Sequence, residues 1–354
     1  MARPPSAQPF SGPAFAWIAA ALFGISTPFA KLLGADLNAF LLAGLLYLGS
    51  GSGLAVWWYA RRGRGPRAEA VLQRADIPWM AAVVLFGGIL GPSLLMLGLQ
   101  STSGSAASLL LNLESLATML IAWLVYRENV DRRLVRGAMA ILAGAVLLSW
   151  DFNAISLSGG AVLIAAACTC WGIDNNLTRK LSGSDPVQIA MIKGLAAGAT
   201  NTLLGMAAGA TWPTVTQVAA TEALGFIGYG VSLVFFVRAL RDLGAARTGA
   251  YFSAAPFVGA LIAIPLFSEP VSIALAVAAM MMAFGVWLLL TEKHEHWHEH
   301  ELTTHEHSHV HDAHHQHDHA PGDPAGAPHT HVHTHLPLRH RHPHFPDLHH
   351  RHDH

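Results

Sequence analysis

Residues 128–148 read ENVDRRLVRGAMAILAGAVLL, and residues 269–289 read EPVSIALAVAAMMMAFGVWLL. The two stretches match at a constant offset of 141 residues: Glu128 with Glu269, Val130 with Val271, Met139 with Met280, Gly144 with Gly285, and Leu148 with Leu289. Two shorter pairs resemble each other as well, FGISTPFAKL (23–32) with WGIDNNLTRKL (171–181) and GPSL (91–94) with GVSL (230–233). A repeat of this length predicts a fold built from two related halves.

The composition places both halves in a membrane. The chain has 354 residues, of which 52% are hydrophobic and only 12% are charged, too apolar for a soluble globular protein. Apolar stretches long enough to cross a bilayer recur along it. We predict ten spans, at residues 14–33, 38–59, 77–99, 105–126, 134–150, 159–178, 187–209, 219–238, 245–267 and 271–290.

The number of spans in each half sets their relative orientation. Because five is odd, the second half must insert upside down relative to the first. The predicted fold class is therefore an all-α polytopic membrane protein with ten transmembrane helices as two inverted five-helix repeats. Its predicted segments are a short N-terminus (1–13), two repeats (14–150 and 159–290) and a tail (294–354). Inverted repeats around a central site permit alternating access, which favours a carrier.

The positions of the basic residues predict the orientation of the chain in the membrane. Lys and Arg are absent from the loops near 34–37, 100–104, 151–158, 210–218 and 268–270. The other loops and their helix ends carry Arg61, Arg62, Arg64, Arg67, Arg74, Arg127, Arg132, Arg133, Arg136, Arg179, Lys180, Arg238, Arg241 and Arg247. Basic loops stay in the cytoplasm, so both termini are expected there, with the protein in the cytoplasmic membrane.

The repeat motifs resemble those of EamA-type carriers of the drug/metabolite transporter superfamily. The resemblance rests on the paired Gly24 and Gly172, on YRENV (126–130) and SEPV (268–271), and on the glycine-containing helices GAMAILAGAVLL and AAMMMAFGVWLL that follow them. It covers about residues 14–290 and implies two five-helix repeats with both termini inside. It implies no particular solute, because such carriers move amino acids, nucleotide precursors, drugs and other molecules.

Glu114 stands out inside an apolar span. Placing a carboxylate there costs about 2.5 to 3.5 kcal/mol, so such a residue usually faces a cavity. At 100° per residue it shares a helix face with Ser103, Ala107, Leu110 and Thr118, which leaves room beside it. Glu114 is either a proton-exchanging group or cation ligand in a central cavity, or a buried structural carboxyl. In the related carriers a proline is expected there, and Pro256 takes nearly that place in the second half.

A second polar cluster lies in the sixth span. We predict that Asp174, Asn175 and Asn176 complete the cavity with Glu114 and Thr118. The competing interpretation pairs Asp174 with Arg179. Lys193 is expected to extend toward the cytoplasmic surface, and Lys31 to anchor the opposite interface. Pro28, Pro92 and Pro256 are expected to bend their helices, and Cys168 and Cys170 to be small packing residues rather than a metal pair.

The tail has a different composition. All 23 histidines lie at or after residue 294, among acids, threonines and prolines, so we expect disorder and metal binding. The ion would be zinc, nickel, cobalt or copper, with no cofactor required by the body. A pH sensor and an expression artefact are the alternatives. The predicted ligands are His294, His296, His298, His300, His305, His307, His309, His311, His314, His315, His317, His319, His329, His331, His333 and His335.

Three functions remain open from the sequence. The first is a secondary carrier for a divalent transition metal or its complex. The second is a transporter, expected to be an exporter, of a small organic metabolite or drug, with a regulatory tail that senses metal or pH. The third is a membrane metal sensor or chaperone platform. An enzyme is not expected, and no ATP-binding loop of the GxxxxGK[ST] type occurs. The expected partners are the bilayer and a small solute or metal ion, without nucleic acid; a homodimer stays open.

Overall fold

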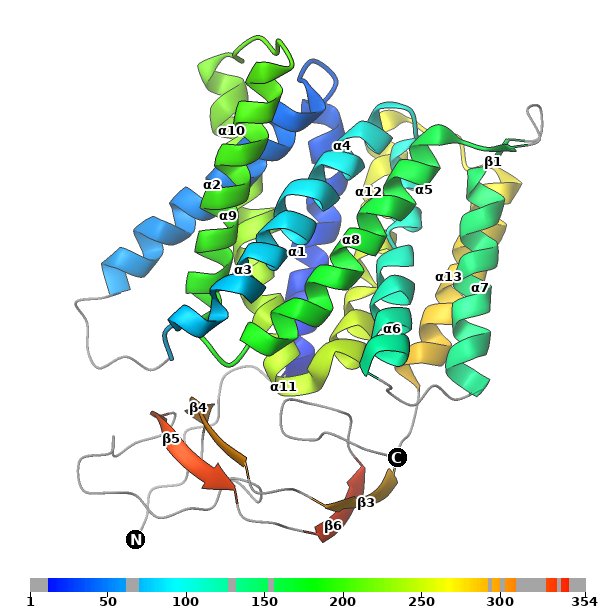
Figure 1. Ribbon diagram of the computed structural model, residues 1–354. Helices are drawn as coiled ribbons and strands as arrows, with labels where there is room; N and C mark the ends of the chain where they lie inside the picture. Colours follow the sequence, from blue (N-terminus) through cyan, green and yellow to red (C-terminus); the bar gives the residue numbers. More distant parts are fainter. Residues whose placement is uncertain are drawn as a thin grey trace, which may run out of the picture.

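The computed structural model describes residues 12–61, 70–126, 132–151 and 156–291, and four short strands after residue 294. The body is a bundle of helices (Figure 1). Its first half contains α1 (Gly12–Leu33), α2 (Ala39–Arg61), η1 (Arg74–Asp76), α3 (Ile77–Val83), η2 (Val84–Leu90), α4 (Gly91–Gln100), α5 (Gly104–Leu110), α6 (Leu113–Tyr126) and α7 (Arg132–Ser149). The second contains α8 (Gly159–Leu181), α9 (Pro186–Ala207), α10 (Val215–Gly225), η3 (Phe226–Val231), α11 (Ser232–Phe252), α12 (Ala255–Phe267) and α13 (Ile273–Leu290).

Irregular helix geometry recurs at nearly the same offset as the sequence repeat. The predicted fourth span is broken at Leu111 and Asn112, between α5 and α6, and the ninth is broken at Ser253 and Ala254, between α11 and α12. The two π-helical segments, η2 and η3, begin at Val84 and Phe226. Since π-helical turns are uncommon and frequently occur at functional sites, their recurrence marks matching places in the two halves.

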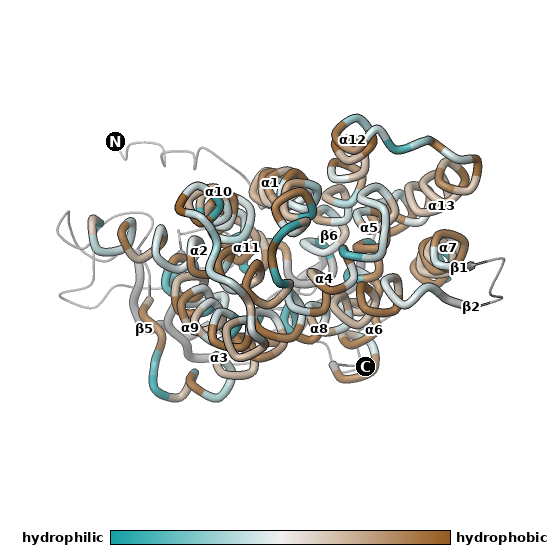
Figure 2. Tube along the Cα trace, turned by 90° about the horizontal axis from the view of Figure 1, so that it is seen from above, coloured by the Kyte–Doolittle hydropathy of each residue, from teal (hydrophilic) through white to brown (hydrophobic). Residues whose placement is uncertain are grey.

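Helices of one half pack mainly on helices of the other. Helix α2 lies against α9, α13 against α7, α1 against α11 and α12, and α8 against α4 and α6. Viewed from above, the two sets of helices interleave rather than form separate lobes (Figure 2). The largest core cluster accordingly joins residues of both halves, among them Tyr47, Leu95, Leu110, Trp171 and Tyr229. The centre of the molecule is thus an interface between repeats.

Close approach of backbones makes this packing depend on small residues. A Cβ atom on Gly24 of α1 would lie 2.4 Å from the carbonyl oxygen of Ala255 at the start of α12. Contacts under 3.0 Å essentially do not occur, so any side chain here would force α1 and α12 apart. Gly24, one of the paired motif glycines, therefore lets the two helices approach closely.

Seven helical stretches within the described residues are long and apolar enough to cross a membrane: Gly12–Leu33, Ala39–Arg61, Arg74–Gln100, Gly104–Val125, Val215–Leu243, Arg247–Phe267 and Ile273–Leu290. Helices α7, α8 and α9 occupy the other three predicted spans, with 18, 23 and 22 residues, but they do not belong to this set. Helices α8 and α9 carry buried polar groups such as Asn175, Lys193 and Asn201. The count of ten membrane spans therefore stays a prediction.

Some predicted boundaries were wrong. Helix α11 runs without interruption through the connection predicted between spans eight and nine.

Pro28 lies inside α1, which continues past it. Pro256 lies in the first turn of α12, where proline is tolerated because the missing amide is not needed. Pro92 lies at the start of α4, which follows η2 without a break, and the carbonyl oxygen of Gly88 four residues earlier accepts a hydrogen bond of 2.9 Å from Asn201 instead.

The strands are short and lie outside the bundle. Trp150–Asp151 (β1) pairs with Ser156–Leu157 (β2). In the tail, β3 (Glu295–Glu299) pairs with β6 (Arg339–Pro343), and β4 (Thr303–His309) pairs with β5 (His329–His335), both antiparallel. Apart from His294, which precedes β3, the predicted histidine ligands fall on these strands or between them in the sequence, and the side chains of all of them are outside the described part of the chain. Disorder and metal binding in the tail stay predictions.

Candidate functional site

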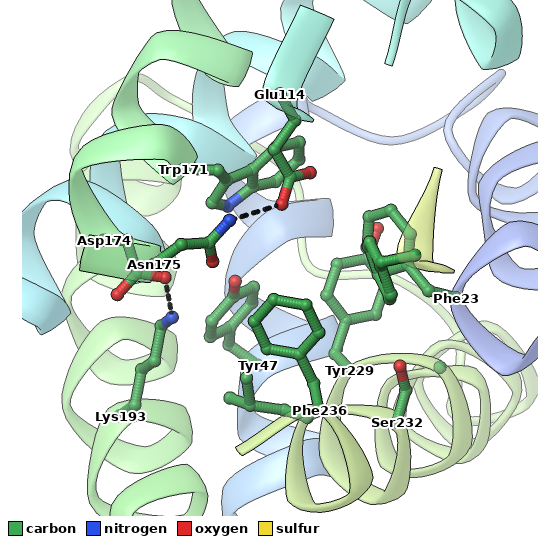
Figure 3. Close-up of a pocket in the computed structure, with 13 residues that line it drawn as sticks. Phe23, Tyr47, Glu114, Trp171, Asp174, Asn175, Lys193, Tyr229, Ser232 and Phe236 are labelled. Carbon is green, nitrogen blue, oxygen red and sulfur yellow. Dashed lines mark hydrogen bonds and ion pairs between the residues drawn. The ribbon is translucent and has the colours of Figure 1, made fainter. Parts of the chain in front are cut away.

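A pocket is lined by residues of both halves (Figure 3). Its empty space is about 450 Å³, including the part open to solvent. The polar lining consists of Glu114, Asp174, Asn175, Lys193 and Ser232, and the aromatic lining of Phe23, Tyr47, Trp171, Tyr229, Phe236 and Phe252. Gly228 and Leu233 complete the wall. Three of the five predicted cavity residues, Glu114, Asp174 and Asn175, therefore line one pocket.

The helix break between α5 and α6 explains the position of Glu114. Because α6 starts at Leu113, Glu114 lies in the first turn of a helix that begins inside the bundle. The unpaired amides of a first turn favour negative charge, which partly offsets the cost of burial. The side chain of Asn175 on α8 donates a hydrogen bond of 2.9 Å to Glu114 Oε1. Glu114 is thus held by one helix of each half.

Asp174 pairs with Lys193, and this outcome corrects two predictions. Lys193 Nζ donates to Asp174 Oδ2, and both side chains are buried. The predicted pairing of Asp174 with Arg179 is therefore wrong, because Lys193 is the partner of Asp174 in this site. The prediction that Lys193 extends to the surface is wrong too. Thr178 Oγ1 donates to the second carboxylate oxygen of Asp174 at 3.1 Å. Each charge of this buried pair has its partner inside the protein, as stability in a low dielectric requires.

Gly87 in η2 contacts several side chains of the pocket wall. Its carbonyl oxygen accepts a hydrogen bond of 2.7 Å from the Tyr47 hydroxyl and one of 3.1 Å from Trp171 Nε1. A Cβ atom on Gly87 would lie 2.1 Å from Asp174 Oδ2 and 2.5 Å from Lys193 Nζ. Only glycine leaves room there for the ion pair, and the wider π-helical turn presents its carbonyl to two side chains.

The aromatic side chains form one continuous wall. Phe23 makes edge contacts with Trp171 and Tyr229, with ring centroids 5.9 and 5.6 Å apart. It also lies 5.4 Å from Phe252, which contacts Phe236 at 4.8 Å. Tyr47 joins the wall through Tyr229, at 5.5 Å. These separations lie in the range preferred by aromatic pairs, so the wall is a packed surface rather than loose side chains.

Two predicted cavity residues lie behind the pocket. Thr118 Oγ1 donates to the carbonyl oxygen of Glu114 at 2.8 Å and accepts from Asn175 at 3.1 Å. Asn176 donates to the carbonyl oxygens of Thr118 and Gly172, at 3.0 and 2.8 Å. Neither lines the cavity. Their hydrogen bonds join α6 to α8 and orient Asn175, so their role is to support the site.

Cys168 uses the backbone freed at the same helix break. It is buried, and its thiol lies 3.8 and 3.9 Å from the carbonyl oxygens of Leu110 and Leu111. Cys170 is only partly buried and forms no disulfide. A packing role is consistent with this arrangement.

A second set of polar contacts ties the connection between α4 and α5. Lys31, at the end of α1, donates to the carbonyl oxygens of Leu99 and Thr102, both at 2.6 Å. Glu269, between α12 and α13, accepts from the amides of Gly104 and Ser105 at 2.6 and 2.9 Å. Lys31 therefore links α1 to the connection between α4 and α5. Glu269 of the SEPV motif links the halves, and Glu128, its counterpart in YRENV, lies outside the described residues.

The described residues contain no group of three His, Cys, Asp or Glu side chains placed to hold a metal ion. Glu114 and Asp174 are the carboxylates of the pocket, but Asp174 is already paired with Lys193. Nothing in this part of the chain therefore supports a metal site.

Sequence reasoning missed most of the pocket wall. Lys193 was visible as a charged residue in an apolar stretch, which is the same signal that singled out Glu114. The aromatic residues carried no such signal, because aromatic side chains are common in membrane helices. Their convergence comes from five different helical elements and cannot be read from spacing along the chain.

A bundle of apolar helices built as two matched halves, with a polar and aromatic pocket between them, is the architecture of a membrane transporter. The chain belongs to the EamA-like transporter family, whose model matches it twice, over residues 10–150 and 158–291. The two matched ranges coincide with the two halves that the sequence repeat predicts.

Similar proteins agree with this class. An uncharacterized transporter from Methanothermobacter thermautotrophicus is 28% identical over 226 residues, covering 62% of this chain and 66% of its own length. The uncharacterized transporter YyaM of Bacillus subtilis is 21% identical over 206 residues, covering 55% of this chain and 67% of its own length. The match thus spans about two thirds of each relative. A protein of known crystal structure shares the fold, with a TM-score of 0.59 and 21% identity over 78% of this chain and 95% of the other.

Proposed function

We propose that this protein is a secondary carrier that moves a small organic solute through the pocket between its repeats. The observation that carries the proposal is the composition of that pocket, a continuous aromatic wall facing one carboxylate and one buried ion pair. Aromatic surface with a few fixed polar groups is typical of sites for organic ligands. Metal ions are instead bound by several converging oxygen, nitrogen or sulfur ligands.

The repeat supports a mechanism of alternating access. In our proposal the ten spans form two inverted repeats, both termini lie in the cytoplasm, and the halves exchange conformations so that the pocket opens to each side in turn. The breaks in the fourth and ninth spans and the segments η2 and η3 are matched places at which each half can bend. Glu114 contacts the solute or exchanges a proton with it, and Asn175 holds the carboxylate in position.

Metal transport is the competing function, and it depends on the histidine tail alone. The tail carries all 23 histidines of the chain, a composition suited to binding zinc, nickel, cobalt or copper. We propose that the tail binds such an ion, and that this ion is not the solute that the body transports. Metal binding by the tail and transport by the body are then separate properties, and each has its own test.

Uptake into proteoliposomes separates the two functions. The purified full chain is reconstituted and screened with organic amines, amino acids, organic acids and neutral aromatics, and with zinc, nickel, cobalt and copper, under pH gradients of both directions. Flux of an organic solute that Gly87→Ala abolishes supports the proposal. Flux of a metal ion with none of any organic solute contradicts it.

A further inference from the structure

We propose that the solute is a small organic cation, whose positive group pairs with Glu114 while its apolar part lies on the aromatic wall. This inference rests on the proposed carrier function and assigns the substrate class of the same pocket.

The first support is the charge of the pocket. The ionisable acids and bases that line it, tyrosines aside, are Glu114, Asp174 and Lys193. Lys193 and Asp174 compensate each other, and Asp174 receives a further hydrogen bond from Thr178. Glu114 receives one from Asn175, a neutral amide. With all three groups ionised, the pocket carries one net negative charge, and that charge belongs to Glu114.

A buried carboxylate without a counter-charge is costly, and two species can remove that cost, a proton or a cationic ligand. Asp174 and Lys193 are the charged groups that act on Glu114. Lys193 attracts the Glu114 carboxylate, whereas Asp174 repels it, so the two effects oppose each other. Lys193 is already paired, so an anionic solute would have to displace Asp174 before it met a positive charge. A cation meets Glu114 directly.

The aromatic wall is the second, independent support. Six rings from both halves line the same pocket as Glu114: Phe23, Tyr47, Trp171, Tyr229, Phe236 and Phe252. Ring faces attract ammonium groups, and the attraction grows when the site is desolvated. The rings also bind the apolar part of an aromatic or alkyl amine. A small inorganic cation would gain little from them, so charge and surface together favour an organic cation.

The test measures binding, independently of flux. Four probes share a phenylethyl skeleton and differ in charge: phenethylamine, 2-phenylethanol, 3-phenylpropionate and L-phenylalanine. Their affinities for the full chain in detergent are measured by isothermal titration calorimetry at neutral pH. We expect phenethylamine to bind at least about tenfold more tightly than each of the others. Glu114→Gln should remove this preference, and Glu114→Asp, which keeps the charge, should retain most of it.

Asp36→Asn is the matched control, because Asp36 is an exposed carboxylate between α1 and α2, away from the pocket. It should leave the preference unchanged. The proposal is overturned if the anion, the zwitterion or the alcohol binds as tightly as the amine, if no probe binds, or if the preference survives Glu114→Gln. Amine binding without flux of any solute in proteoliposomes would instead contradict the carrier function and leave the cation site intact.

Discussion

Asn175 and Glu114 form a hydrogen bond of 2.9 Å across the boundary between the two repeats, inside the pocket. Glu114 comes from α6 of the first half and Asn175 from α8 of the second. This hydrogen bond therefore forms only when the two halves are correctly assembled around the carboxylate.

Asn175→Leu should lower the free energy of unfolding by about 1 to 2 kcal/mol, because it leaves the buried Glu114 carboxylate without its donor. The loss should be smaller when Glu114 is also replaced by leucine, since no unsatisfied carboxylate then remains. Chemical unfolding in mixed micelles measures the four members of this cycle. Additive losses in the double variant would contradict a direct interaction.

Lys193→Met should destabilise the protein by about 3 to 5 kcal/mol, because it leaves the Asp174 carboxylate buried without its partner. The double variant Lys193→Met, Asp174→Leu removes both charges and should recover most of that stability. It should still transport poorly, since the polar wall of the pocket is altered. Unfolding and uptake are measured together, and a double variant no more stable than the single one would argue against the pair.

Gly87→Ala should abolish uptake, since its Cβ would overlap the carboxylate of Asp174 and approach the ammonium group of Lys193. Gly159→Ala is the control, because a Cβ there meets nothing within 4 Å at the start of α8. Initial rates in proteoliposomes compare the two variants. Equal rates would show that the pocket wall is not crowded at Gly87.

Glu269→Gln should lower the free energy of unfolding by about 0.5 to 2 kcal/mol, the range expected when a helix loses its N-terminal cap. The physical reason is that a neutral amide accepts hydrogen bonds from the amides of Gly104 and Ser105 less strongly than a carboxylate does. Asp36→Asn serves here too as an exposed carboxylate that caps no helix. Thermal unfolding in detergent is the measurement. A change no larger than that of Asp36→Asn would mean that the contact contributes nothing.

Deleting residues 294–354 should abolish high-affinity zinc binding and leave organic solute uptake intact. The tail supplies every histidine, whereas every residue that lines the pocket precedes it. Calorimetry with zinc and uptake in proteoliposomes are run on the full and shortened chains. Loss of uptake on deletion would show that tail and body act as one unit.

The candidate site could be predicted only in part. Glu114 and Asp174 were found because an ionisable group in an apolar helix is costly enough to signal a cavity. The partner of Asp174 was not found, because Arg179 and Lys193 are both basic residues near it along the chain. Only the packing of α9 against the rest of the bundle brings Lys193 to the carboxylate. Thr118 shares the helix face of Glu114 as expected, but it supports the site instead of lining it.

The repeat, the apolar helices and the isolation of all histidines in the tail are properties that the sequence determines by itself. They follow from local regularities, namely a constant offset, the length of apolar stretches and composition, and each can be counted along one chain. The helix breaks, the aromatic wall and the pairing of Lys193 with Asp174 were decided by tertiary structure. The aromatic wall depends on contacts between helices of opposite halves, such as those of Phe23 with Trp171 and Tyr229. The ion pair depends on how α8 and α9 of the second half pack against each other. Such contacts join residues that are distant along the chain or lie on different helices, so no local pattern records them.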